Sequence, residues 1–320
     1  MKKGDKEWLI FAETGKWISS LFASHCCPWF LPSRSSATAT ATAPAAIPSS
    51  SLDGILKKQP NPNCDHKMKG TAARADSTLN WIHHDSDLPD FYFRTIQKEN
   101  VEQVAEFLLK YFFAEEPLGQ SLKLDPNKEV RPWLSKMLEH EIREGLSIVV
   151  RLRSLDSEDS TVDNQGEIVA VCLNDVERKV NDPEDVNIFT FVERDSQPNM
   201  WMITRVLDEL VSGEDVFNGY QVESLVSCQM LCVNPRFGGR GLAQKLIQLT
   251  EELTKTLGYS LIISEATSEF SARAFLKAGF LCLKTIQYDA FTIDGDQQPF
   301  QQLSSDGVHT AARLMIKHLK

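Results

Sequence analysis

The residue types best suited to chemistry lie between Cys232 and Phe280. In the first segment, Cys-Val-Asn-Pro-Arg-Phe-Gly-Gly-Arg-Gly-Leu-Ala (232–243) joins an apolar run to an amphipathic helix. In the second, Ser-Ala-Arg-Ala-Phe-Leu-Lys-Ala-Gly-Phe (271–280) opens a shorter helix and ends it at a glycine. Three glycines between a strand and a helix gather several backbone N–H groups, and the helix dipole adds positive potential there. The pattern therefore predicts an anion site, for which a pyrophosphate is the best-fitting ligand.

A carboxylate pair stands at the end of another amphipathic helix, in Phe-Phe-Ala-Glu-Glu-Pro-Leu (112–118). Apolar surroundings raise the pKa of a carboxylate toward the range in which it works as a base. The same pair, Glu115 and Glu116, could instead only solvate the helix end. Thr267 and Ser268, at the start of a later helix, could likewise be caps without a chemical role.

Composition narrows the function classes. The chain has 320 residues, 42% of them hydrophobic and 24% charged, as in a soluble globular protein. A net charge of −10, without a basic stripe, argues against a nucleic-acid partner. No apolar stretch approaches the ~20 residues that cross a bilayer. The seven cysteines show no paired C-x-x-C spacing, so we expect free thiols, no metal and a cytoplasmic location.

The first 87 residues differ from the rest. The segment 35–52 contains only Ser, Ala, Thr and Pro apart from Ile47 and Leu52, too few large apolar side chains to fold. The apolar runs before it are interrupted by acidic residues and do not match a signal peptide. We expect residues 1–87 to be a disordered tail, or a gene-model extension with Met68 as the working start. One folded domain is expected over 88–320.

The periodicity of this domain predicts strands alternating with helices. Strands are expected at 91–96, 146–152, 167–173, 222–233, 261–264, 280–288 and 311–318, the last closing the sheet. Helices are expected from about residue 100 to 112, from about 130 to 145, at 199–210, from 242 to about 257, and at 268–277. The strands 146–152 and 167–173 should form a hairpin. This order predicts a mixed α/β sheet and excludes a dinucleotide fold, which needs its glycines after the first strand.

Residues 232–243 and 271–280 together resemble the GCN5-related N-acetyltransferase (GNAT) superfamily. That family binds acetyl-CoA through Val-x-Pro-x-x-x-Gly-x-Gly-x-Ala, followed by a helix that ends in Gly-Phe. Finer features are similar to the insect-type arylalkylamine (dopamine) N-acetyltransferases. The resemblance covers 88–320 and implies the GNAT fold, a mixed, mostly antiparallel central sheet flanked by helices on both faces. It also implies acetyl-CoA as cosubstrate, with no metal.

The resemblance assigns cofactor-binding roles to the strand and loop. The backbone of Leu231 and Val233 would pair with the pantetheine arm, and a strand N–H near Val233 would meet the oxyanion. The N–H groups expected to hold the pyrophosphate are those of Gly239, Arg240, Gly241, Leu242 and Ala243. At Gly238 the family usually has Gln or Arg, so this chain lacks that side chain and keeps the backbone donors.

The resemblance also implies catalytic residues. Glu116 matches the glutamate of a Glu-Pro-Leu stretch that serves as base through water. At Phe275 many relatives have a tyrosine that protonates the leaving thiolate, and phenylalanine has no such proton. Ser271, one turn earlier on the same helix face, could take that role, with Thr267 as a second hydroxyl.

Substrate-pocket residues are less distinct. His309, expected in the last strand, matches a histidine often present in the family. Tyr111 and Phe113 could wall an aryl pocket or make cation–π contacts. Each of the three could equally be structural.

We therefore expect acetylation of a small primary amine, by direct attack of the deprotonated amine on the thioester. An arylalkylamine such as dopamine, tyramine, octopamine, serotonin or tryptamine is the first expectation. A polyamine or other small-amine acetyltransferase is the alternative enzyme, and a catalytically silent acyl-CoA-binding domain is the non-enzymatic one. No nucleic-acid or membrane partner is expected, and the chain should be a monomer.

Overall fold

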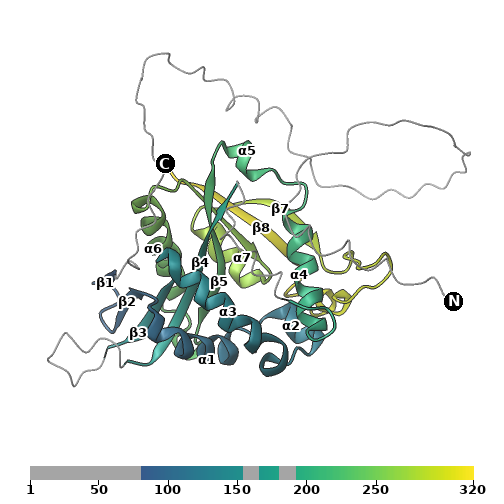
Figure 1. Cartoon of the computed structure of the whole chain (residues 1–320), viewed down its shortest axis with the longest axis horizontal. Helices are drawn as coiled ribbons and strands as arrows, with labels where there is room; N and C mark the ends of the chain where they lie inside the picture. The colour runs from purple at the N-terminus through teal and green to yellow at the C-terminus, as the bar shows by residue number, and fades with distance from the viewer. Residues whose placement is uncertain (1–80, 154–165, 180–191) are drawn as a thin grey trace, which may run out of the picture. The chain divides into compact units, whose positions relative to one another are not determined.

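A computed structural model describes residues 81–153, 166–179 and 192–320. Their strands form one eight-stranded sheet in the order β1-β2-β3-β4-β5-β6-β8-β7 (Figure 1). The strands are β1 (Ile82–His84), β2 (Phe91–Thr95), β3 (Ile148–Leu152), β4 (Ile168–Arg178), β5 (Ser224–Val233), β6 (Leu261–Ala266), β7 (Leu281–Gln287) and β8 (Ala311–His318). All neighbouring pairs are antiparallel except β5 and β6. The predicted mixed, mostly antiparallel sheet is confirmed, as is the β3–β4 hairpin.

Helices cover both faces of this sheet. They are α1 (Val101–Tyr111), α2 (Pro117–Leu122), α3 (Arg131–Glu141), α4 (Pro198–Val211), α5 (Val216–Tyr220), α6 (Leu242–Thr256) and α7 (Glu269–Lys277). One buried cluster joins α1, α3 and α4 to one face, and a second joins α6 and α7 to the other. In β3, Val149 belongs to the first cluster whereas Ile148 and Val150 belong to the second. This alternation follows from the period of two along a strand.

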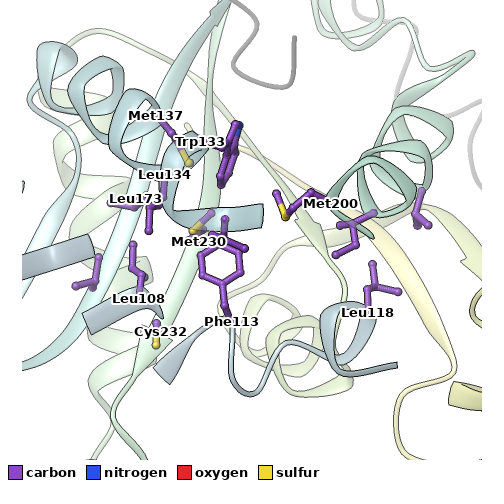
Figure 2. Packing of buried hydrophobic residues seen from close by; sticks show 14 of the residues in the cluster. Leu108, Phe113, Leu118, Trp133, Leu134, Met137, Leu173, Met200, Met230 and Cys232 are labelled. Atoms are coloured by element: carbon purple, nitrogen blue, oxygen red, sulfur yellow. The ribbon is translucent and has the colours of Figure 1, made fainter. Parts of the chain in front are cut away.

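The cluster on the α1–α3–α4 face leads directly to the functional region. Figure 2 shows Phe113, Trp133, Met200 and Met230 gathered around one another. The rings of Phe113 and Trp133 meet edge to face, with centroids 6.5 Å apart. Phe113 is 7% exposed, so this side chain is held in the core just before the chain reaches Glu116.

Two features differ from the expectations. β1 lies inside the segment assigned to the N-terminal tail, so the sheet begins before residue 88; residues 1–80 lie outside the described part. β8 does not close the sheet at its edge, because it pairs with both β6 and β7 and leaves β7 outermost. Strand order depends on pairing between distant segments, which local periodicity does not encode.

The middle of the sheet is irregular on both sides of β5. The β4–β5 register shifts between Leu173 and Asn174, so Gln229 has no partner in β4. The buried Asn174 holds this bulge: its N–H donates to Ser147 Oγ at 3.0 Å, and its Nδ2 donates to the Leu146 carbonyl at 2.9 Å. A bulge bends its strand and increases the local twist.

On the other side, β5 and β6 separate after two residue pairs. They pair at Val226 and Ser227 only. Beyond these pairs, the carbonyl of Cys228 accepts a 2.8 Å hydrogen bond from the Ser264 hydroxyl. The remainder of β5, up to Val233, therefore has one edge that β6 does not cover.

We predict that Ser264→Ala lowers the free energy of unfolding by about 1–3 kcal/mol, because it leaves the buried Cys228 carbonyl without a donor. Urea denaturation measures this loss. Ser264→Thr keeps the hydroxyl and should recover most of it. A stability of Ser264→Ala equal to that of the wild type would contradict this account of the strand separation.

Candidate active site

The loop after β5 has the backbone geometry of an anion site. Asn234 Oδ1 accepts from the N–H of Arg236 at 3.0 Å and caps a short turn, Pro235–Phe237. Gly239 and Gly241 then adopt φ of +74° and +84°. Gly241 is the N-cap residue of α6 and provides no side-chain cap. Hence the first N–H groups of α6 remain available to a ligand.

The glycines are needed for their backbone conformation. A Cβ added at Gly239 or Gly241 would meet nothing within 4 Å, so close packing does not impose glycine there. Left-handed residues beside the start of a helix turn successive N–H groups to a common point. The Arg240 guanidinium lies back over the Phe237 ring, 5.6 Å from its centroid. The backbone donors and the positive end of α6 fit a diphosphate.

The uncovered edge of β5 adds a second binding element. The N–H of Asn234 donates to the Val169 carbonyl of β4 at 2.8 Å. Successive residues of a strand direct their N–H and C=O groups to opposite sides. Leu231 and Val233 therefore direct theirs away from β4, toward the side from which β6 has diverged. An extended chain bearing amides, such as pantetheine, fits that edge.

Glu116 stands at the start of α2 and contacts the end of β6. Its Oε2 accepts from the N–H of Gly119 at 2.6 Å, as an N-cap. Its Oε1 accepts from the Thr267 hydroxyl at 2.9 Å, across 151 residues of sequence. Burial raises the pKa of the Glu116 carboxyl above its ordinary value, and these hydrogen bonds offset part of that effect. The site thus holds a carboxylate with the environment of a base.

Thr267 is fixed from both sides. Its hydroxyl is committed to Glu116, and its carbonyl accepts from the Tyr288 hydroxyl at 2.5 Å. Tyr288 is fully buried. Sequence reasoning did not single out Tyr288, because nothing local shows that a strand-end tyrosine meets this carbonyl. The cap at the start of α7 is Ser268, so the capping alternative applies to Ser268 and not to Thr267.

Ser271 belongs to that capping arrangement. Its N–H donates to Ser268 Oγ at 3.0 Å, and its hydroxyl donates to the Ser268 carbonyl at 3.0 Å. Ser271 also lines a cavity that contains Glu116, so its hydroxyl is held in place near that carboxylate. Phe275, one turn on, is 2% exposed and packs on Phe280, 4.9 Å between ring centroids.

One cavity of about 1640 Å³ brings most of these groups together. The predicted site residues that line it are Leu231, Val233, Glu116, Thr267, Ser271, His309, Phe113 and Tyr111. Arg240 and Gly241 line a smaller cavity of about 500 Å³ with Lys245 and Lys317. Gly239, Leu242 and Ala243 line neither of the two. The part of the loop from Gly239 to Ala243 therefore lies outside the cavity that contains Glu116, although Pro235 lines it.

The expected substrate-pocket residues have mixed surroundings. His309 precedes β8 rather than lying in it, because β8 begins at Ala311. Its Nδ1 accepts from the N–H of Glu269 at 3.2 Å, and its ring meets Phe270 edge to face. Burial lowers the pKa of His309, which favours the neutral ring. Phe113 is a core residue with one side on the cavity, and Tyr111 is half-buried at its rim.

Four carboxylates in the same cavity were not expected from the sequence. Asp175 and Glu177 lie on β4, Asp208 lies on α4, and Glu265 lies on β6. Three of them lie in two strands, β4 and β6, where apolar neighbours dominate the local pattern. The signal that could have identified them is an acidic side chain inside a strand otherwise buried on both faces.

In the described part of the chain, no cluster of three or more His, Cys, Asp or Glu side chains is arranged to hold a metal ion. Within the same residues, no helix has the length and apolarity needed to cross a bilayer.

No family model matches the chain. Among solved structures it is similar to arylalkylamine N-acetyltransferase 2 from Aedes aegypti, with 25% identity and a TM-score of 0.61 over 72% of this chain and 100% of that one. It also matches mosquito arylalkylamine N-acetyltransferase-like 5b, with 20% identity and a TM-score of 0.56 over the same shares. The Drosophila melanogaster polyamine N-acetyltransferase, which forms N-acetylagmatine, has 22% identity and a TM-score of 0.56 over 72% of this chain and 100% of that one. The chain has the GNAT fold and resembles insect arylalkylamine N-acetyltransferases, as predicted.

We predict that Gly241→Ala weakens binding of coenzyme A by about 5- to 30-fold, because an L residue at this positive φ costs roughly 1–2 kcal/mol and distorts the loop. Calorimetric titration measures the affinity. Gly258, at the other end of α6, has φ +85° and similar open space, so Gly258→Ala is the matched control. It should lower stability without changing affinity. Equal affinity of Gly241→Ala and wild type would contradict the assignment of the loop.

Proposed function

We propose that this chain, an acyltransferase of the arylalkylamine N-acetyltransferase type, transfers an acetyl group from acetyl-CoA to a small primary amine. The observation that carries the proposal is the Glu116–Thr267 contact, in a cavity that also contains the free edge of β5. Arylalkylamines are natural test substrates, because Tyr111, Phe112 and Phe217 line this cavity. The further carboxylates that line the same cavity favour the polyamine alternative.

Two parts of the chain would hold acetyl-CoA. The N–H groups from Gly239 to Ala243 suit its pyrophosphate, and the Leu231–Val233 edge suits its pantetheine amides. Acetyl-CoA supplies the thioester carbonyl carbon to which the amine nitrogen bonds, with the thiol as leaving group. The Val233 N–H, directed into the gap beside β5, can donate to the negative charge that develops on the carbonyl oxygen.

Glu116 has the properties required of the base. An alkylamine arrives as an ammonium ion and must lose a proton before its nitrogen can attack. The raised pKa of Glu116 makes its carboxylate a stronger proton acceptor than an exposed glutamate. Only the ionised form accepts, so activity should rise as the pH passes upward through that pKa.

Ser271 is the hydroxyl we assign to the departing thiolate. Phe275 has no proton to give, and the Thr267 hydroxyl is committed to Glu116. The Ser271 hydroxyl, at the cavity wall, donates to the Ser268 carbonyl and would turn from that carbonyl to donate to the sulfur as the thioester bond breaks. His309, neutral at the same wall, is assigned to the amine pocket.

We predict that Glu116→Gln reduces kcat/KM for a primary amine by about 10²- to 10⁴-fold at neutral pH, because the amine then has no positioned base. The loss should shrink at high pH, where more amine is already neutral. A thiol-release assay across about pH 6 to 9 measures both effects. Glu115→Gln, an exposed neighbour, is the matched control and should retain activity. Wild-type rates for Glu116→Gln across this range would refute its role as base.

We predict that Thr267→Val shifts the rising limb of the pH–rate profile to higher pH. The Thr267 hydrogen bond favours ionised Glu116, so its removal raises the pKa of that carboxyl further. Thr267→Ser keeps the hydroxyl and should return the profile to its original position. A profile unchanged in Thr267→Val, with only a lower maximum, would show that Thr267 serves packing alone.

A further inference from the structure

The charged side chains that line the cavity of about 1640 Å³ do not balance one another. Eight of the described side chains that line it carry a carboxylate, and three carry a lysine or arginine charge. Glu116 accounts for one carboxylate through its role as base. The function proposed above leaves the others unexplained.

Four of these carboxylates form a group, which we call the carboxylate cluster: Asp175, Glu177, Asp208 and Glu265. Burial, together with the neighbouring charges of Glu177 and Asp208, raises the pKa of Glu265 to about 8. Burial likewise raises the pKa of Glu177 to about 7, against a hydrogen bond from Ser227. Grouped acids with raised pKa values lack sufficient positive charge nearby.

The cations near the cluster neutralise only part of it. Arg205 pairs with Asp208 on the same helix. Lys179 Nζ lies 3.5 Å from Glu223, and Arg178 pairs with Glu144 at 2.9 Å, both outside the cluster. His140 Nε2 lies 3.6 Å from Asp175 Oδ2. Glu177 and Glu265 therefore remain without an ion-pair partner among the described residues.

An independent observation points to a missing donor. Asp175 is only 8% exposed and lines the cavity, yet its Oδ1 has no hydrogen-bond partner in the described structure. Gln229, the extra residue of the β5 bulge, also lines the cavity, and its buried Oε1 has no partner in the described structure either. Buried acceptors left unpaired cost free energy, and a ligand that brings N–H donors would satisfy them.

The carboxylate cluster lies close enough to Glu116 for one short substrate to reach both. Glu265 precedes Thr267 by two residues and both line the cavity, and two residues of extended chain span about 6.6 Å. Thr267 in turn holds Glu116. A substrate whose amine reaches Glu116 can therefore extend a second group to Glu265.

We propose that the carboxylate cluster binds a second cationic group of the amine substrate, so that the preferred substrates are short diamines or guanidino-amines. The proposal rests on the proposed function for the acetylated end and adds a recognition site for the other end. Ammonium and guanidinium groups are both multiple N–H donors with a positive charge, as the cluster requires.

The test compares two amines that differ at one end. 1,4-Diaminobutane carries an ammonium where 1-aminopentane carries a methyl group. We expect kcat/KM for the diamine to exceed that for 1-aminopentane by about 10- to 100-fold, as charge-assisted hydrogen bonds provide. Equal values, or a preference for 1-aminopentane, would overturn the proposal.

Substitutions inside and outside the cluster show whether the cluster causes the preference for the diamine. Glu265→Gln and Asp208→Asn should each raise the KM for 1,4-diaminobutane by about 10-fold or more and change that for 1-aminopentane by less than about 2-fold. Glu223→Gln removes one exposed charge outside the cavity and should leave both amines unaffected. Equal losses for both amines in the two cluster variants would overturn the proposal, since the residues would then act on folding or on the base.

A binding measurement separates this proposal from the proposed function. Calorimetry with 1,4-diaminobutane on protein saturated with coenzyme A requires no turnover. Binding that Glu265→Gln weakens, with no acetylation of any amine, would support the cluster as a cation site and refute acetyl transfer. Turnover of both amines, with no binding preference for the diamine, would refute the cluster and leave acetyl transfer standing.

Discussion

The separation of β5 from β6 beyond Ser227 is the constraint on which the rest of the structure depends. Where a regular sheet would continue, the Ser264 hydroxyl donates to the Cys228 carbonyl, and the β5 bulge at Gln229 bends the β4–β5 pair. The backbone groups of the half-buried Leu231 and Val233 are thereby left unpaired with β6, beside the cavity. Such groups are costly unless a ligand pairs them. The open edge therefore indicates a binding site, and the diverging end of β6 carries Thr267 to Glu116.

In the cavity beside this gap, burial acts on the pKa values of several carboxylates, and hydrogen bonds oppose its effect to different degrees. Burial raises the pKa of Glu116, which suits the role of base proposed for it, and the hydrogen bonds from Gly119 and Thr267 oppose that rise. Tyr288 fixes the Thr267 backbone, so the supporting hydroxyl is held by a buried residue. At the other end, Glu177 and Glu265 have burial without comparable support. The two ends thus suit different tasks, proton transfer at Glu116 and cation binding at the cluster.

Much of the fold followed from local pattern, because strand periodicity and the glycine loop are short-range features. Gly241 could be predicted since a left-handed residue before a helix has a local signature. Glu116 could be predicted from its Glu-Pro-Leu context. The place of β8 between β6 and β7 could not, because pairing partners are chosen by packing. The carboxylate cluster was missed for the same reason: Glu177 and Glu265 are 88 residues apart, and only the folded sheet brings them to one cavity.

The central claim is that the free edge of β5 and the loop after it bind coenzyme A through their backbone N–H groups. Amide hydrogen exchange, measured residue by residue with and without acetyl-CoA, tests it most directly. The account predicts slower exchange at Leu231, Val233 and the amides from Gly239 to Ala243 when acetyl-CoA is present. Unchanged exchange at these positions, in protein saturated with the nucleotide, would contradict it.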